Sequence, residues 1–365
     1  MALYKDCGCK LVELAVRSHL VNFCRRFASS SETLKIQKWK KNLHIYSYSF
    51  NWGGLSELAH VLANNVIMNE DGLVVLNKPH GIGKEEPIIN KSRIEREKRL
   101  RTAIVGEKDF YLNEILPLLA HKLGYEHLET VKIPERYTSG VSVLSSSQEL
   151  TNHVKNCIQK GKNQGKILDT YHVVCVGTPS PISYKGKVAI QHEQDKICGG
   201  SQPILLTKWS KNSAKRGDVT TVSVEHTTLQ QGPFASLVEV KPSRTKSHFL
   251  RVYMAYMMSP ILGDNLYGSR VQNVGGRSLA ISPFSDRAKL PQRLEDPMLA
   301  ALDLERQDER FIPAHVHLHR VEIPDFGGKG KPLEIEAPPP EVFSWTCKQV
   351  IYKGSPKVER ADVKC

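Results

Sequence analysis

The sequence predicts an α+β domain built on a mixed, largely antiparallel β-sheet that is flanked by helices and loops. Segments rich in β-branched residues follow one another from about residue 140 to residue 242, with polar or glycine-containing breaks between them. Apolar segments of helical length interrupt them only a few times. Strands that come in runs with a few inserted helices are typical of α+β domains.

The expected elements follow in chain order. Apolar residues at helical spacing predict a helix over 55–68, and a short buried strand over 71–83 is ended by Pro79 and two glycines. A second helix over 109–124 ends at a glycine, and a buried helix over 247–259 interrupts the later strands. The other predicted strands are 140–147, 170–177, 187–193, 220–226, 236–242, 315–323 and 332–337.

The charge of the chain favours a polyanionic partner. Lysine and arginine number 51 against 38 aspartates and glutamates, a formal net charge of +13. Residues 1–28 contain five basic and two acidic side chains, which leaves 46 basic and 36 acidic residues and a charge of +10 for the rest. The basicity therefore belongs to the predicted folded part, as expected of a protein that contacts phosphates. No stretch approaches the roughly 18 apolar residues of a membrane span.

The N-terminal segment has the composition of a mitochondrial presequence. It is basic, contains serine, and ends in "RRFASS", which resembles the arginine, aromatic, serine pattern that matrix proteases cut. Asp6 and Glu13 count against this interpretation, and the alternative is an ordinary frayed terminus. We expect residues 1–46 to be a presequence and flexible basic linker, and the protein to be located in the mitochondrial matrix.

The cysteines and histidines predict no metal site. Outside the presequence the cysteines are scattered without any Cys-x-x-Cys pair, at Cys157, Cys175, Cys198, Cys347 and Cys365. His315, His317 and His319 alternate along a predicted strand, where neighbours on one face are roughly 6.6 Å apart. Because three such side chains cannot surround one zinc ion without distortion, we expect a strand there.

Five segments resemble the motifs of a known family, in its order and at plausible spacings. They are "DGLVVLNKPHGI", "RYTSGVSVLSSS", "LDTYHVVCVG", "TKSHFLRVYMAYMMSPILGDNLYG" and a closing "AHVHLHRVEIP" followed by "APPP". Over roughly residues 66–345 the chain resembles the RluA-type pseudouridine synthases, most of all the divergent mitochondrial RPUSD-type branch. The resemblance implies the pseudouridine synthase fold over 47–345, with a C-terminal tail over 346–365.

The resemblance implies a catalytic carboxylate at Glu135. The family's second motif usually reads HRLD ahead of TSG, and the position of its aspartate, five residues before Gly140, is occupied here by glutamate. Arg251 stands in an otherwise apolar segment and must be paired, because an isolated buried charge costs several kcal/mol. The resemblance implies that Glu135 is its partner, whereas Glu239 or Asp264 would make a structural ion pair.

The same resemblance assigns a role to Tyr171, which begins the strand of the third motif. It implies that the ring stacks on the target base and assists at its C5 proton. The alternative is a plain core aromatic, the commoner fate of a strand tyrosine. The chain departs from the family pattern at Ile133, Pro134 and Phe249, and Asp169 occupies a site that is usually basic.

Candidate RNA contacts flank these positions. Lys132, Arg136, Lys246 and His248 lie in or beside the second and fourth motifs, where phosphate contact is expected. Because exposed basic residues are common, a merely solvated role is the alternative for the lysines and the arginine.

The chemistry that the resemblance implies needs no cofactor and no metal. A uridine is flipped out of the RNA, its glycosidic bond breaks with help from the carboxylate, and uracil rejoins the sugar through C5. Glutamate carries the same charge as aspartate, but its extra methylene moves the oxygens by about 1.5 Å, and a misplacement of about 1 Å can cost roughly 10²-fold in rate.

Two functions therefore stand as predictions. The first is an RNA pseudouridine synthase that acts on mitochondrial rRNA or mRNA with Glu135 as its carboxylate. The second is a protein of the same fold that binds RNA without isomerising it and assists mitochondrial ribosome or mRNA function. The expected partners are RNA (mitochondrial rRNA, mRNA or tRNA) and proteins of RNA granules or ribosome assembly.

Overall fold

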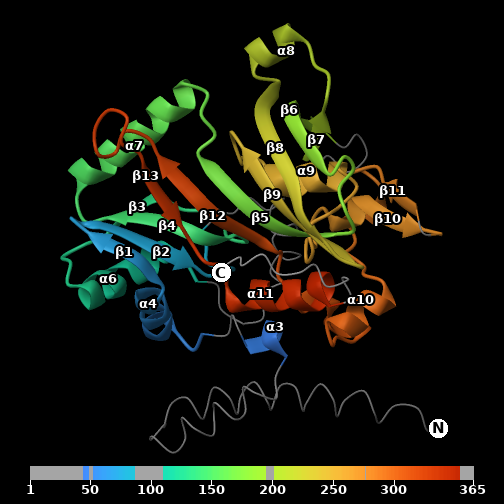
Figure 1. Cartoon of the computed structure of the whole chain (residues 1–365), viewed down its shortest axis with the longest axis horizontal. Helices are drawn as coiled ribbons and strands as arrows, with labels where there is room; N and C mark the ends of the chain where they lie inside the picture. Colours follow the sequence, from blue (N-terminus) through green and yellow to red (C-terminus); the bar gives the residue numbers. More distant parts are fainter. Residues whose placement is uncertain (1–43, 49–51, 87–109, 195–200, 276, 354–365) are drawn as a thin grey trace, which may run out of the picture.

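A single large sheet organises the molecule (Figure 1). The computed structural model describes residues 44–48, 52–86, 110–194, 201–275 and 277–353. Eleven strands of this part follow the order β1-β2-β4-β12-β5-β9-β8-β6-β7, with β3 beside β4 and β13 beside β12. Their bounds are β1 (Val66–Glu70), β2 (Leu73–Lys78), β3 (Glu129–Lys132), β4 (Ser139–Ser145), β5 (Asp169–Val176), β6 (Ser183–Gln194), β7 (Ser201–Leu206), β8 (Val219–Gln231), β9 (Ala235–Pro242), β12 (Val316–Ile323) and β13 (Leu333–Glu336).

The pairing of these strands is antiparallel except where β12 meets β4. A separate two-stranded ribbon joins β10 (Val271–Val274) to β11 (Arg277–Ala280). The prediction of an α+β domain with a mixed, largely antiparallel sheet is therefore confirmed.

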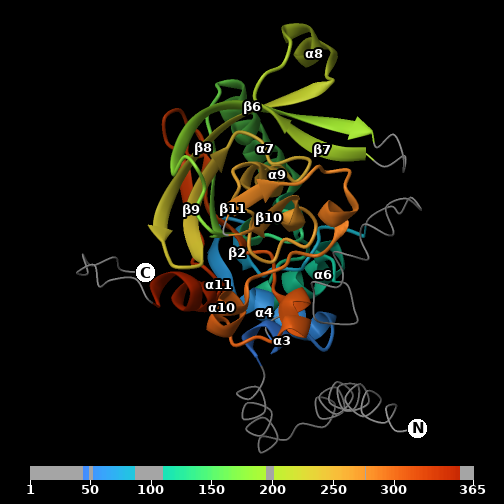
Figure 2. The ribbon, with the colours of Figure 1, turned by 90° about the vertical axis from the view of Figure 1, so that its right-hand side faces the viewer.

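Helices cover both faces of the sheet. Their bounds are α3 (Ile45–Tyr48), α4 (Leu55–Asn64), α6 (Leu112–Leu123), α7 (Gln148–Asn163), α8 (Lys211–Arg216), α9 (Phe249–Tyr256), α10 (Asp296–Ala301) and α11 (Glu341–Cys347), followed by a π-helical turn over Lys348–Tyr352. Among these helices none combines the length and the apolar character that crossing a bilayer requires. Helix α8 is at the tip of the projection that β6, β7 and β8 form, and it buries no side chain (Figure 2).

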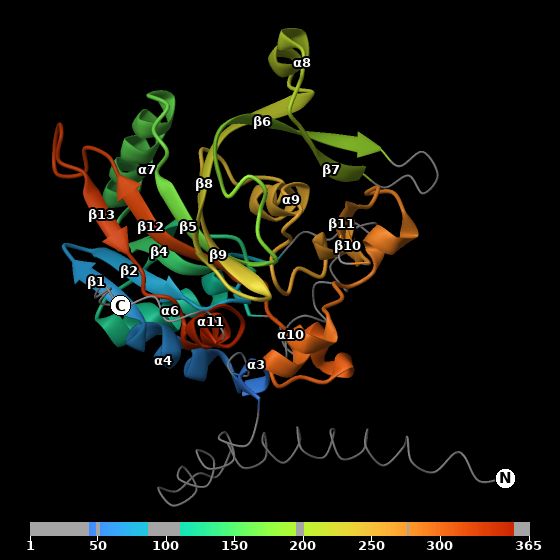
Figure 3. The same cartoon turned by 45° about the vertical axis from the view of Figure 1, so that its right-hand side comes forward.

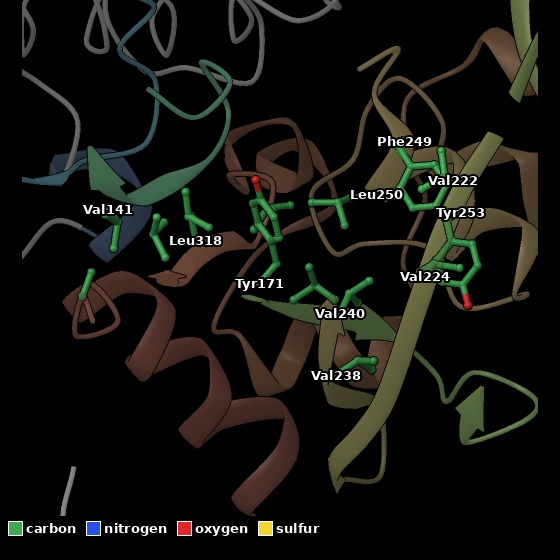
Figure 4. Close-up of a cluster of buried hydrophobic side chains, with 14 of the residues drawn as sticks. Val141, Tyr171, Val222, Val224, Val238, Val240, Phe249, Leu250, Tyr253 and Leu318 are labelled. Atoms are coloured by element: carbon green, nitrogen blue, oxygen red, sulfur yellow. The ribbon is translucent and has the colours of Figure 1, made fainter. Parts of the chain in front are cut away.

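Alternation along the strands separates two apolar layers. Val74 and Leu76 of β2 pack with α4 and α6, whereas Val75 faces the opposite side and joins the cluster of α7 and α9. In this second cluster Tyr171 lies among the side chains of β9, β12 and α9 (Figure 4). Figure 3 shows α9 within the curve formed by β6, β7 and β8. Helix α9 is thereby held against the end of the sheet that these three strands form.

Gly140 allows the two halves of the sheet to join. The contact of β4 with β12 is short, with Ser139 opposite His317 and Gly140 opposite Leu318. Gly140 has φ of 114°, and a Cβ atom there would lie 2.2 Å from the Leu318 carbonyl oxygen. Only glycine fits this close approach, because a side chain would meet backbone that cannot move aside.

Replacing Gly140 by alanine is expected to cost about 2–5 kcal/mol of unfolding free energy, because backbone strain and overpacking combine. Gly165→Ala is the matched control, since Gly165 also has positive φ, at 76°, but open space around it. That change is expected to cost only about 1–2 kcal/mol. Denaturant unfolding of both variants measures the difference, and equal costs would show that the contact with β12 is not tight.

One predicted helix is longer than the helix in the structure. The helix expected over 55–68 ends at Asn64, and Val66 begins strand β1. Asp71 and Gly72, both with positive φ, turn the chain so that β1 pairs with β2 as a hairpin. Pairing with β2 thus outweighs the helical periodicity of residues 66–68.

The folded part extends beyond both expected boundaries, 47 and 345. Ile45 and Tyr46 are buried, and so are Val350 and Ile351 of the π-helical turn. All four belong to one apolar cluster with α10 and α11. The predicted presequence, residues 1 to about 28, lies outside the described residues.

Candidate active site

Glu135 lies in a turn that other parts of the chain hold in place. The turn joins β3 to β4 and is closed by a hydrogen bond from the Thr138 amide to the Glu135 carbonyl oxygen, at 2.9 Å. Next to it, the Arg136 carbonyl oxygen accepts from the Gly81 amide at 2.8 Å, and the Arg136 Nε donates to the Gly81 carbonyl oxygen at 3.0 Å. The first motif therefore braces the turn that bears Glu135.

Lys78 stabilises the loop of the first motif that contacts this turn. It is fully buried, and its Nζ donates to the carbonyl oxygens of Pro79 (3.1 Å) and Ile82 (3.0 Å). Burial, assisted by the nearby Arg136 cation, lowers the pKa of Lys78 to about 7. The lysine of the first motif thus ties its own loop by backbone contacts.

Arg136, a predicted RNA contact, is already engaged on the protein. Besides its bond to Gly81, its guanidinium lies 5.6 Å from the ring centroid of Tyr111 and 5.7 Å from that of Tyr137. Its position favours a structural role beside Glu135, and contact with RNA stays a prediction.

A pocket of about 360 Å³, counting the space at its mouth, joins the three predicted catalytic residues. The pocket lies where the β3–β4 turn, β5, β12 and the start of α9 meet. Its lining consists of Glu135, Tyr137, Thr138, Tyr171, Thr245, His248, Leu250, Arg251 and Val316.

The environment of Glu135 favours its protonated form. The residue is exposed to solvent, although nearby protein atoms remove part of the hydration of its carboxyl group. This desolvation raises the pKa of Glu135 to about 7, and the positive charge of Arg251 acts in the opposite direction. The carboxyl group therefore titrates close to neutral pH.

Tyr171 is buried at the base of the pocket. Its side chain hydrogen-bonds to that of Thr245, and burial, together with the charges of Asp169 and Glu135, raises its pKa well above the usual range. The phenol is consequently neutral at physiological pH and offers an aromatic face with a hydroxyl group.

Arg251 is buried as predicted, but its ion-pair partner is Asp264. The Nη2 of Arg251 donates to the Asp264 Oδ1, and the two side chains are 6% and 0% exposed. The prediction that Glu135 takes this place is wrong for this structure: among the described residues Glu135 forms no ion pair within 4.0 Å. Glu135 nevertheless lines the same pocket and is subject to the Arg251 charge. Asp264 was one of the two alternatives.

The loop before α9 is strained and well anchored. Ser247 and His248 both have positive φ, at 60° and 55°, a conformation that is costly for residues other than glycine. The His192 Nε2 lies 3.0 Å from the Ser247 Oγ, and the His248 Nδ1 lies 2.8 Å from the Tyr267 hydroxyl group. These contacts hold His248 in the lining of the pocket.

Lys132 and Asp169 form an ion pair. The Lys132 Nζ lies 2.8 Å from the Asp169 Oδ2, and both side chains are largely buried. Lys132 and Asp169 both differ from the family pattern, and in the structure each neutralises the charge of the other. Lys246, by contrast, is exposed at the start of the strained loop.

Proteins similar to this chain are pseudouridine synthases. It is 30% identical over 295 residues to the mitochondrial mRNA pseudouridine synthase Rpusd3 of Mus musculus, covering 80% of this chain and 79% of that protein. It is 25% identical over 308 residues to the mitochondrial pseudouridylate synthase RPUSD4 of Rattus norvegicus, covering 80% and 71%. No protein-family model matches the chain.

The chain belongs to the RluA-type pseudouridine synthase family. Among solved structures, the human RNA pseudouridylate synthase domain containing 4 has a TM-score of 0.56 at 21% identity, over 81% of this chain and 96% of that one, and shares the fold. Membership makes the chain an RNA pseudouridine synthase, an isomerase, and the pocket is where the family motifs meet.

Besides two apolar residues, Leu250 and Val316, sequence reasoning missed three residues with hydroxyl groups in this synthase pocket. Tyr137, Thr138 and Thr245 line it, and each is next to or within a motif that had been recognised. Thr245 stands at the glycine position of GRTHQIR, so its hydroxyl group was a departure that the motif comparison could have identified.

Proposed function

We propose that this chain isomerises uridine to pseudouridine in mitochondrial RNA, with Glu135 as the reacting carboxylate. The observation that carries the proposal is the convergence of Glu135, Tyr171 and Arg251 on one pocket at the centre of the sheet. A base flipped out of the RNA would stack on the Tyr171 ring, and Glu135 would act at the sugar. The mRNA named for the mouse relative supports mRNA as the first substrate to test.

The reaction balances without a cofactor. The bond between N1 and C1′ breaks while Glu135 either adds to C1′ or removes the C2′ proton, and the base then turns. As C5 bonds to C1′, either the Glu135–C1′ bond breaks or the C2′ proton returns to the sugar from Glu135; the C5 proton then leaves, and N1 takes up a proton. In this scheme the neutral Tyr171 hydroxyl group assists at C5, and Arg251 favours the ionised form of Glu135.

The rate is expected to rise with pH through neutrality. Either role of Glu135 requires the carboxylate, and its pKa is raised to about 7 in the folded protein. The apparent kcat/KM should therefore increase roughly tenfold per pH unit below pH 7 and level off above pH 7. Measuring it between pH 5.5 and 8.5 on one RNA at constant ionic strength checks this, and a rate already constant from pH 5.5 would contradict it.

RNA binding is proposed to involve a cluster of cations beside the pocket. Lys162, at the end of α7, has its pKa lowered by partial burial and by Lys132, Arg244 and Lys246, whereas Asp169 raises it. Lys132 and Asp169 neutralise each other. The remaining positive charge, on exposed side chains, would suit phosphates that flank the flipped nucleotide.

Neutralising this cluster is expected to weaken RNA binding at every sequence tested. The combined changes Lys162→Gln, Arg244→Gln and Lys246→Gln should lower the slope of log affinity against log salt concentration by roughly 2 to 3. Lys122→Gln, Lys348→Gln and Lys353→Gln together are the control, since these exposed lysines lie on α6 and the C-terminal helical segment, away from the pocket. Equal slopes for the two triple variants would exclude the cluster as the RNA contact.

A second function, RNA binding without isomerisation, is favoured by two observations. Glu135 replaces aspartate, and Arg251 is paired with Asp264. Depletion of the protein followed by mapping of pseudouridine in mitochondrial RNA separates the two functions. Sites lost on depletion should return with the wild type and stay absent with Glu135→Ala, and no lost site would favour binding alone.

The mitochondrial names of the relatives also support import into the organelle, and matrix location follows from the RNA that would be modified. Proteins of RNA granules or of ribosome assembly are proposed partners of such an enzyme.

A further inference from the structure

Arg251 is anchored through one of its three side-chain nitrogens. Its Nη2 donates to Asp264, and its guanidinium carbon lies 5.3 Å from the ring centroid of Tyr267 and 5.8 Å from that of Tyr137. Within the described part of the chain its Nε and Nη1 are buried and have no hydrogen-bond partner. A guanidinium can hold two carboxylates because its five N–H donors point in different directions in one plane, so Arg251 keeps unused donors beside a pocket that contains Glu135.

Asp264 is a rigid anchor for the Nη2 of Arg251. It is fully buried, and its Oδ1 also accepts from the backbone amides of Leu266 and Tyr267 at 3.0 Å each. The preceding Gly263 has φ of 79°, and a Cβ atom there would lie 2.1 Å from the Pro313 carbonyl oxygen. The turn is therefore fixed by its own hydrogen bonds and by close packing, so the position of the Asp264 carboxylate does not depend on Arg251.

We infer that Asp264 is a positioning residue, which fixes Arg251 through Nη2 so that the positive charge and the remaining donors of the guanidinium act on Glu135. The inference rests on the proposed role of Glu135. Asp264 would have two effects: it sets the direction of the guanidinium, and its negative charge offsets part of the Arg251 field. The pKa of Glu135 agrees with the second effect, since it is raised to about 7 despite a cation in the same pocket.

Apart from Lys78 in the bracing loop, whose pKa is also about 7, the other groups near Glu135 are neutral or fixed. The phenol of Tyr171 from β5 has a raised pKa, and the imidazole of His80 has its pKa held well below 6.5 by burial and by neighbouring cations. His248 and Tyr267 are hydrogen-bonded to each other, and Arg136 is attached to Gly81. A change of charge at Asp264 should therefore reach Glu135 mainly through Arg251.

Asp264→Asn is the central test, because asparagine keeps an oxygen for the two backbone amides and removes only the charge. The titration of Glu135 is followed through its effect on the unfolding free energy. The difference in unfolding free energy between a protein with Glu135 and its Glu135→Gln counterpart falls as pH rises from about 4.5 to the folded pKa, and is constant above it. We call the pH above which this difference is constant the endpoint. Denaturant unfolding of the full chain between pH 4.5 and 9, in both backgrounds, gives it without any assay of activity.

The expected endpoint is near pH 7 for the wild-type background and below about 6 with Asp264→Asn, because Arg251 then compensates its charge with Glu135 alone. The surface change Asp218→Asn, which removes the partner of Arg216, is the matched control and should leave the endpoint near 7. An unchanged endpoint with Asp264→Asn would overturn the inference.

Arg251→Lys covers the case in which Asp264→Asn does not fold. The single ammonium group of lysine cannot extend in two directions at once, so it should stay with buried Asp264 and leave Glu135 with an endpoint above 7. An endpoint at or below 7 would again overturn the inference. Failure of the proposed function looks different: shifted endpoints with no pseudouridine formed by the wild type would leave the positioning contact intact and remove its catalytic purpose.

Discussion

Glu135→Ala is expected to lower kcat/KM for pseudouridine formation by about 10²- to 10⁴-fold, the range in which a positioned acid–base or nucleophilic side chain contributes. RNA affinity should stay within a few-fold, since the proposed phosphate contacts lie elsewhere. Stability at pH 8 should not fall, because the ionised carboxylate is the form that its surroundings disfavour. Initial rates at a fixed salt concentration measure kcat/KM, and filter binding measures the RNA affinity.

Glu149→Ala is the matched control, because Glu149 is an exposed glutamate in the first turn of α7. It should retain the wild-type rate. Unchanged turnover by Glu135→Ala would mean that another carboxylate acts at the sugar, with Asp169 beside Tyr171 as the first candidate.

Arg251→Ala is expected to reduce the unfolding free energy by about 3–5 kcal/mol. The change leaves Asp264 fully buried with an uncompensated charge, which is the costly way to break a buried pair. Arg216→Ala removes a comparable ion pair at the surface and should cost about 0–1 kcal/mol. Urea unfolding at pH 7.5 gives both values, and a loss below about 1 kcal/mol at position 251 would show that Asp264 is not charged in the folded protein.

The sheet could be predicted from local composition because its strands alternate between two apolar layers. β5, β9 and β12 match their expected ranges within a few residues, since β-branched residues recur there between polar or glycine breaks. Residues 66–68 were wrongly predicted as helix because their pairing with β2 depends on residues beyond the local periodicity. The same limit applies to Ile45 and Val350, which are buried by packing together from opposite ends of the chain.

The pocket was predictable as a set of residues, but its ion pairs were not. The motif order brought Glu135, Tyr171 and Arg251 together as expected. Which carboxylate meets Arg251 depends on a turn 13 residues further along, where Asp264 is held by backbone amides. Likewise Lys132 and Asp169 departed from the family pattern separately, and only the fold shows that they compensate each other.

The most direct test of the central claim, that Glu135 is a working carboxylate, compares wild type with Glu135→Asp on the same mitochondrial RNA at the same salt concentration. Conversion of uridine to pseudouridine is followed at single sites. The account predicts that the wild type forms pseudouridine and that Glu135→Asp forms it at an equal or higher rate, because the shorter side chain restores the reach that the family uses. A wild type that forms none, beside an active Glu135→Asp variant, would contradict it and show that one methylene silences an otherwise intact pocket.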